Sequence, residues 1–318
     1  MQQNSLAQAK NESVQTAQIV EGPYKSAERT GVPGGLAFWG VHLACLFVFA
    51  VGFSWVALAV AMLTYWLRVF ALTAGYHRYF AHRSYKTSRL FQFLMAFLGA
   101  SSAQMGPLWW AAHHRHHHRF SDTEEDIHSP VISGFWWSHM GWVLSDRYNK
   151  TNYNKIPDFA KFPELRFINR FHVIAPIALA VGLYYLGAWL QVAAPSLGTS
   201  GWQLVIWGFF ISTTLVYHAT FFVNSLAHVV GSRRFLTRDQ SRNNWFIALV
   251  TMGEGWHNNH HRYPSSAQQG FYWWEIDMSH YVLRMLSWVG LVWDLRKPPE
   301  ELYDEAAGQK RIEQDIAA

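Results

Sequence analysis

Four long apolar segments most strongly constrain how this chain can fold. Residues 36–53, 55–75, 171–194 and 202–223 are almost wholly apolar, and each is close to the roughly 20 residues that a helix needs to cross a bilayer. Only 15% of the chain is charged, against about 25% in soluble domains. Composition alone leaves open a large soluble enzyme with a thick core. The length of the segments instead predicts an all-α integral membrane protein with four transmembrane helices.

Short breaks divide the four segments into two hairpins. The loops at residues 52–54 and 195–201 contain no Lys or Arg, and Arg68 alone of the 26 basic residues lies within an apolar segment. Because basic residues accumulate on the cytoplasmic side, this distribution places both termini and the long polar segments in the cytoplasm. An arginine within a span is costly unless it faces a polar cavity or reaches the interface, and the sequence does not decide between these for Arg68.

Polar segments flank the apolar region at both ends of the chain. We expect residues 1–34 to form a disordered N-terminal tail, residues 35–297 a single membrane domain, and residues 298–318 a polar C-terminal tail. No apolar core of a signal peptide is present near the start. The net charge of +5 is not gathered in one motif, so we expect no nucleic-acid partner. The single cysteine, Cys45, excludes a disulfide framework and a thiolate metal site.

Most of the 17 histidines fall in four short clusters. In the predicted topology every cluster lies at the cytoplasmic end of a span or in a cytoplasmic segment, so clusters distant in sequence can converge just outside the lipid. The histidines of these clusters that we expect to bind metal are His77, His82, His114, His117, His118, His228, His257, His260 and His261.

The spacing within the clusters supports metal binding. His114, His117 and His118 stand at i, i+3 and i+4, which a helix presents on one face. The last cluster repeats this spacing, and Asn224 lies one turn before His228. His77 and His82 are separated by about 140° on an α-helix, so they need a helix end or a turn to converge. Imidazole suits iron, copper, zinc and nickel, and nine imidazoles are too many for one ion, so a site for two metal ions is predicted.

The other histidines do not share this spacing. His113 and His116 point away from the predicted ligand face, and we expect structural or surface roles for His42, His128, His139, His172, His218 and His280. Glu125, Asp126 and Glu254 are candidates to accept hydrogen bonds from ligand imidazoles. Solvated loop charge is an equally simple interpretation of these three acids.

Together the clusters resemble the membrane fatty-acyl desaturase family, in its delta-9, stearoyl-type branch. That family has H-x4-H, H-x2-HH and H-x2-HH boxes, with an N-x3-H element between the last two, in the order found here. The strings T-A-G-Y-H-R, W-S-H-M-G-W and G-E-G-W-H-N-N-H-H are also similar. The resemblance extends from about residue 35 to residue 293. It implies that the nine histidines bind two iron ions, that Asn224 binds one through a water, and that O₂ is a co-substrate.

The resemblance also implies residues that shape the substrate tunnel. Gln104, Trp110 and Thr220 match positions that bend the acyl chain, Phe221 replaces a tryptophan of that set, and Tyr65 matches the tyrosine that closes the far end. The implied product is a cis double bond in a long saturated acyl chain. Animal acyl-CoA enzymes carry Arg-Asp directly before the second box, where this chain has Ala-His. This difference weakens the case for CoA and leaves a lipid-linked substrate open.

Each turnover needs two electrons from outside the chain. The sequence shows no cluster of four cysteines, no dinucleotide fingerprint and no haem domain, so we expect a separate donor such as a ferredoxin, a rubredoxin or a haem cytochrome with its reductase. Without a retention signal or a fused haem domain, a bacterial inner membrane is the expected location.

Two other functions remain open from the residues. A di-iron fatty-acid or alkane hydroxylase would use the same histidines. A histidine-rich membrane metal transporter would place its ligands near the bilayer midplane, whereas the clusters follow the predicted spans.

Overall fold

A computed structural model describes residues 32–317 of the chain. The predicted N-terminal tail therefore lies outside the described residues, except for its last three, which begin a helix. Helices form almost all of the regular structure. Among the described residues, strands are limited to an antiparallel pair formed by β1 (Lys86–Thr87) and β2 (Val292–Trp293). The predicted all-α fold is confirmed.

Within residues 32–317, three helices are long and apolar enough to cross a membrane: Trp55–Ala81, Ile174–Ala193 and Gly201–His228. The first joins α4 (Trp55–Phe70) to the π-helix η2 (Ala71–Ala81), and the second is α10 (Ile174–Ala193). The third is built in order from α11 (Gly201–Val205), η8 (Ile206–Ile211), α12 (Ser212–Asn224) and η9 (Leu226–His228). These helices correspond to three of the four predicted spans.

The first predicted span forms a shorter apolar helix, Gly35–Val51. It comprises α2 (Val32–Ala44), η1 (Cys45–Phe47) and α3 (Val48–Val51). It ends at Gly52, whose φ of +69° is readily adopted only by glycine. Ser54 then begins α4 by accepting a hydrogen bond from the Ala57 N–H with its hydroxyl group.

Two of the long helices continue beyond the apolar sequence. The sequence predicted ends at residues 75 and 223, but helical structure extends to Ala81 and to His228. The π-helix η2 packs against α5 (Arg89–Ala100) and α6 (Pro107–Phe120). His77 on η2 and His228 on η9 therefore lie on helical continuations of the spans, outside the apolar sequence.

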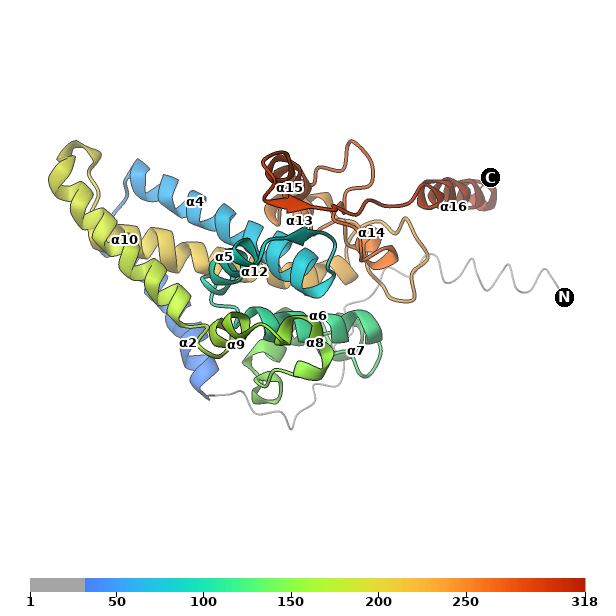
Figure 1. Cartoon of the computed structure of the whole chain (residues 1–318), viewed down its shortest axis with the longest axis horizontal. Helices are drawn as coiled ribbons and strands as arrows, with labels where there is room; N and C mark the ends of the chain where they lie inside the picture. The colour runs from blue at the N-terminus through green and yellow to red at the C-terminus, as the bar shows by residue number, and fades with distance from the viewer. Residues whose placement is uncertain (1–31, 318) are drawn as a thin grey trace.

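Short helices gather at one end of the molecule, as Figure 1 shows, while α4 and α10 extend to the other end. We call this gathering the cap. Besides α5 and α6 its α-helices are α7 (Pro130–Ser133), α8 (Pro157–Ala160), α9 (Pro163–Arg170), α13 (Trp245–Val250), α14 (His257–Arg262) and α15 (Met278–Trp288). Its π and 3-10 turns are η3 (Trp137–Gly141), η4 (Trp142–Leu144), η5 (Asp146–Tyr148) and η6 (Tyr153–Lys155), and η7 (Pro195–Leu197) lies in the distant loop.

The predicted C-terminal tail contains a helix, α16 (Glu301–Ala317), in the structure. Its Leu302 and Ala306 are buried against Phe235 and Phe271 of the cap. Glu305 accepts hydrogen bonds from Arg262, at the end of α14. At least the first turns of this polar segment therefore pack on the cap.

Arg68 is buried among polar groups of the neighbouring helices. Its guanidinium donates to Ser212 Oγ and Thr213 Oγ1, each at 2.6 Å, and to the Thr64 and Ser101 carbonyls at 3.0 and 3.4 Å. The side chain is 1% exposed. Arg68 therefore faces a polar pocket between α4 and α12 and does not reach toward the interface.

We expect Arg68→Ala to lower the stability of the folded protein by about 2–5 kcal/mol, because it empties a buried site and removes charge-assisted hydrogen bonds. Thermal unfolding in detergent would measure the change. Arg89→Ala is the control, since Arg89 is exposed and pairs with Glu164 on the cap, and its effect should be much smaller. Equal unfolding temperatures for the two variants would contradict this role of Arg68.

Candidate metal centre

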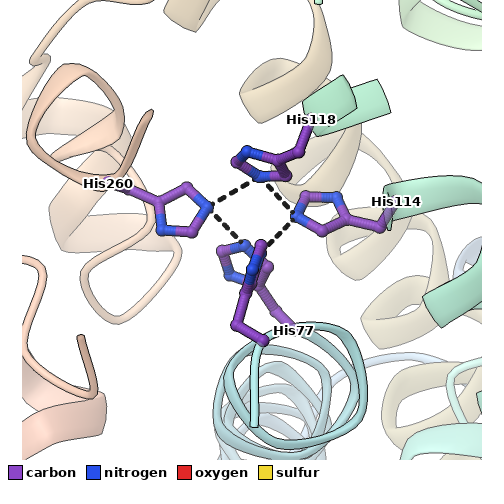
Figure 2. A group of neighbouring side chains, drawn as sticks. His77, His114, His118 and His260 are labelled. Carbon is purple, nitrogen blue, oxygen red and sulfur yellow. Dashed lines mark hydrogen bonds between the residues drawn. The ribbon is translucent and has the colours of Figure 1, made fainter. Parts of the chain in front are cut away.

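Five of the nine histidines predicted to bind metal meet around one point. They are His77, His82, His114, His118 and His260, and their ligand nitrogens all lie within 4.8 Å of one another. The Nε2 atoms of neighbouring rings are 2.9–3.0 Å apart. In Figure 2 the rings of His77, His114, His118 and His260 turn their nitrogens toward a shared centre.

A π-helix explains how His77 and His82 converge despite their spacing. In η2 the backbone hydrogen bonds join residues five apart, and the His82 N–H donates to the His77 carbonyl at 3.2 Å. Residues five apart then lie about one turn apart, and the two ring centroids are 4.9 Å from each other. The sequence required a turn or a helix end at this point, and the structure provides a widened helix.

The other four predicted histidines form a second group. They are His117, His228, His257 and His261, and their ligand nitrogens also lie within 4.8 Å of one another. The Nε2 atoms of His228 and His257 are 3.0 Å apart. His261 Nε2 is buried without a hydrogen-bond partner, and a buried polar atom of this kind needs an additional ligand.

The two groups share helices. From α6, His114 and His118 enter the five-histidine group while His117 enters the four-histidine group. From α14, His260 enters the first group while His257 and His261 enter the second. The i, i+3, i+4 spacing thus serves two adjacent centres, because each helix directs neighbouring histidines of one face to different groups.

Buried carboxylates hold the outer nitrogens of four of these rings. His117 Nδ1 donates to Asp126 at 3.0 Å, and His77 Nδ1 contacts Glu254. Asp126 and Glu254 were among the predicted acceptors, whereas the third candidate, Glu125, bonds Thr123 at the surface. Each such contact fixes the ring orientation and leaves Nε2 free to bind a metal.

Two further acceptors have no counterpart among the residues singled out from the sequence. Asp122 accepts from His228 Nδ1 at 2.9 Å, and Asp239 accepts from His261 Nδ1 at 2.8 Å. Burial raises the pKa of Asp122, but the charge of His228 and several hydrogen bonds outweigh it and lower that pKa to about 2. The carboxylate is therefore ionised at neutral pH. No spacing rule in the sequence relates either acid to its histidine.

Most of the imidazoles are uncharged in this environment. Burial is the main cause, followed by the charges of neighbouring histidines, and the pKa falls well below its usual value for His82, His114, His118, His257 and His260. Burial also lowers the pKa of His261 to about 4, although Asp239 opposes the shift. Neutral imidazole is the form that binds metal, so the site is ready to accept a cation at neutral pH.

Two cavities meet beside the histidines. The outer cavity has a volume of about 550 Å³, and the inner cavity has about 40 Å³. Both are lined by Trp110, His114, Thr220 and Asn224. The inner cavity also touches His77, His117 and His257, and so reaches members of both histidine groups.

Four of the five predicted substrate residues line these cavities. Gln104 and Phe221 line the outer cavity, and the Gln104 side-chain amide donates to Thr220 Oγ1 at 3.1 Å. Trp110 stacks on His114 with ring centroids 4.9 Å apart. Tyr65 lines neither cavity. It lies one turn before Val69, which lines the inner cavity, and its hydroxyl donates to the Val250 carbonyl at 2.6 Å.

The histidines outside the two groups have separate places. His113 lines the outer cavity and bonds the Trp109 carbonyl, while His116 bonds the Glu125 carbonyl away from the centre. His128 was expected to be structural, but it is buried, stacks on His117 and forms a further possible metal group with His117 and Asp126. His172 also lines the outer cavity.

A hydrogen-bonded chain joins three of the remaining histidines. His42 Nε2 lies 3.1 Å from His218 Nε2, and His218 Nδ1 lies 3.0 Å from His139 Nε2. His139 in turn bonds Ser225 Oγ at 3.0 Å. Consistent with a structural role, these contacts tie α2 and η3 to α12.

Comparison with known proteins identifies the family. The family model described as fatty acid desaturase matches residues 53–293. The chain is 37% identical to sn-1 stearoyl-lipid 9-desaturase from Anabaena variabilis, over 82% of this chain and 92% of the relative. It is 38% identical to acyl-CoA 5-desaturase from Anemone leveillei (87% and 82%) and 36% identical to delta-9 acyl-lipid desaturase 1 from Arabidopsis thaliana (82% and 81%). These matches confirm the resemblance in the histidine boxes, and the chain belongs to the fatty acid desaturase family.

Proposed function

We propose that this protein is an O₂-dependent fatty-acyl desaturase that introduces a cis double bond into a long saturated acyl chain. The observation that carries the proposal is the contact between an apolar cavity and two adjacent groups of five and four histidines. A methylene group has neither an acidic proton nor a leaving group, so side chains alone cannot remove its hydrogens. O₂ would be the oxidant, and two bound iron ions would activate it. Two hydrogens from neighbouring carbons, with two electrons and two protons from outside the chain, would reduce O₂ to two water molecules.

The residues present fit two metal ions. His77, His82, His114, His118 and His260 would hold one ion, and His117, His228, His257 and His261 the other. The donors are all imidazole nitrogens, a set that suits iron. The partnerless Nε2 of His261 supports occupancy of the second group. Asn224 lines both cavities, and we assign it a metal ligand role through a water.

The cavities support a path for the acyl chain. A chain lying in the outer cavity would pass Trp110 and Thr220 and continue into the inner cavity beside His77 and His257. The Gln104–Thr220 hydrogen bond braces the wall where the cavities meet. A fixed bend at this point would select both the carbon pair and the cis geometry. Delta-9 placement is supported by the family resemblance and by the 9-desaturase names of several relatives.

The topology and the partners are also proposals. We place four spans in the bilayer of a bacterial inner membrane, with both termini and the cap in the cytoplasm, and assign residues 35–297 to one membrane domain. The absence of Lys and Arg from the two short loops supports this orientation. A separate ferredoxin, rubredoxin or haem cytochrome would deliver electrons at the cap.

The function is tested by the fatty-acid profile of a desaturase-deficient host that expresses the protein. We expect a new cis-monounsaturated acid, with the bond position fixed by mass spectrometry, and none from His118→Ala, because His118 belongs to the five-histidine group. His116→Ala is the matched control on the same helix and should retain activity. Hydroxylated acids would instead assign a hydroxylase. Transport of metal by vesicles without any change in lipids would assign a transporter.

Asp239→Asn should weaken metal binding by about 10–100-fold, because Asp239 orients His261 from behind. Competition with a chelator, followed by metal analysis, measures the affinity of each ion. Among the proposed ligands, Asp239 contacts only His261 of the four-histidine group. The ion in that group should therefore be lost well before the ion in the five-histidine group. Asp294→Asn is the control, because Asp294 pairs with Lys86 at the surface. Simultaneous loss of both ions would contradict the assignment of separate groups.

Tyr65→Ala should allow longer acyl chains, because Tyr65 stands just beyond the residues that line the inner cavity. Each additional methylene that a closed pocket excludes is worth about tenfold or more in selectivity. For products two carbons longer we therefore expect the ratio to native-length products to rise by about 100-fold. Tyr65→Phe keeps the ring, loses only the hydrogen bond to Val250, and should keep the native chain length. An unchanged product length in Tyr65→Ala would remove Tyr65 from the tunnel end.

A further inference from the structure

The outer cavity has a wall formed by two apolar helices. Phe38 and Val41 of α2 line one side, and Ile177 and Val181 of α10 line the other together with Val173, the N-cap of α10. These last three residues are spaced four apart and therefore form one stripe along the helix. They are 52%, 59% and 49% exposed. The stripe is thus not covered by other parts of the described chain.

The surface around this wall is suited to lipid. Leu36 and Trp39 of α2 are 69% and 50% exposed, and Ile174 of α10 is 41% exposed. The helix α10 is one of the three long enough to cross a membrane. Exposed apolar side chains on a spanning helix lie in hydrocarbon, so this side of the cavity adjoins the bilayer and not the aqueous phase.

The cavity also lacks charge. Among the described residues that line it there is no Lys, Arg, Asp or Glu. The phosphates of a water-soluble carrier such as CoA are bound most strongly by cationic side chains. The polar groups of the lining are neutral amides, hydroxyls and imidazoles, including Gln104, Asn149 and Thr220. Such groups can hydrogen-bond the ester oxygens of a glycerolipid without a charged partner.

We propose that the gap between α2 and α10 is a lateral portal through which an acyl chain still esterified to a membrane glycerolipid reaches the histidine groups. The headgroup stays in the adjoining leaflet while the chain lies in the outer cavity. This proposal rests on the proposed function and specifies its substrate as acyl-lipid. It also explains why a pair without a cationic side chain, Ala112 and His113, can precede the second histidine box.

A photoaffinity experiment tests the portal without requiring turnover. The full-length, iron-loaded protein in lipid nanodiscs is exposed to phosphatidylcholine with a diazirine on a saturated acyl chain, or to the same chain on CoA. We expect the lipid probe to label peptides of the outer cavity and saturated phosphatidylcholine to compete with it. An excess of stearoyl-CoA should not compete. Strong labelling by the CoA probe at the same peptides would overturn the proposal.

Matched substitutions on α10 locate the entry. Val181→Trp places a large ring in the lining stripe, and we expect it to lower labelling by roughly tenfold, a loss of about 1.4 kcal/mol in binding. Val192→Trp is the control, because Val192 is 82% exposed on the same helix and lies outside the lining. Iron content equal to wild type would show that both variants fold. Equal labelling of the two variants would overturn the portal.

Activity distinguishes failure of the portal from failure of the proposed function. Protein that binds the lipid probe but forms no double bond on any carrier, when a competent electron donor is present, would contradict the function alone. Protein that desaturates stearoyl-CoA in detergent, with Val181→Trp as active as wild type, would contradict the portal alone.

Discussion

Nine imidazole rings can face one another in this protein because other groups hold the rings from behind. Four of the outer nitrogens meet carboxylates, Glu254, Asp126, Asp122 and Asp239. Buried carboxylates are themselves costly unless they are hydrogen-bonded. Asp122 therefore accepts the Gln240 N–H and Asp239 accepts the Ser241 N–H. The loop between η9 and α13 thus supplies donors to both aspartates.

Glu254 shows how the support extends into the membrane helices. Arg78, on η2, lies 3.2 Å from Glu254 and 2.9 Å from Asp277, and it also donates to the Ala267 carbonyl at 2.8 Å. All three charged side chains are buried. Removing one would leave a buried charge without its partner, which is strongly destabilising. The ring of His77 is thus fixed by a network that joins a span to the C-terminal part of the cap.

The sequence predicted that nine histidines converge and which of them share a helical face, because i, i+3, i+4 spacing is a local property. Three of the four predicted spans correspond to long apolar helices, since the length of an apolar segment can be read from the sequence without tertiary contacts. It did not predict the π-helix at residues 71–81 or the extension of the spans into the cap, because these depend on tertiary packing. The helix η2 packs against α5 and α6, and α12 packs against η3 and α13. Asp239 was missed for the same reason, since its partner His261 is distant in sequence.

The two asparagines within H-N-N-H-H illustrate what spacing alone leaves out. A helix as short as α14, with six residues, is not stable by itself. Asn258 Oδ1 accepts the Arg234 and Phe235 N–H groups, and Asn259 donates to Glu275 at 2.9 Å. Both asparagines are fully buried. The histidines of this motif can be presented to two centres because the asparagines between them anchor the helix to the cap.

The position of the metal centre follows from two opposing solvent requirements. A saturated acyl chain is most stable in hydrocarbon, whereas the buried carboxylates that orient the imidazoles need backbone N–H donors that a continuous membrane helix has already used. The structure meets both by extending two spans past their apolar sequence into a cap of short helices and turns. The loops of the cap supply backbone N–H donors, such as those of Gln240 and Ser241. His77 and His228 stand on these extensions, and the cavities reach back between the spans. A site at the midplane would lack the donors, and a site farther out in the cap would lose contact with the chain.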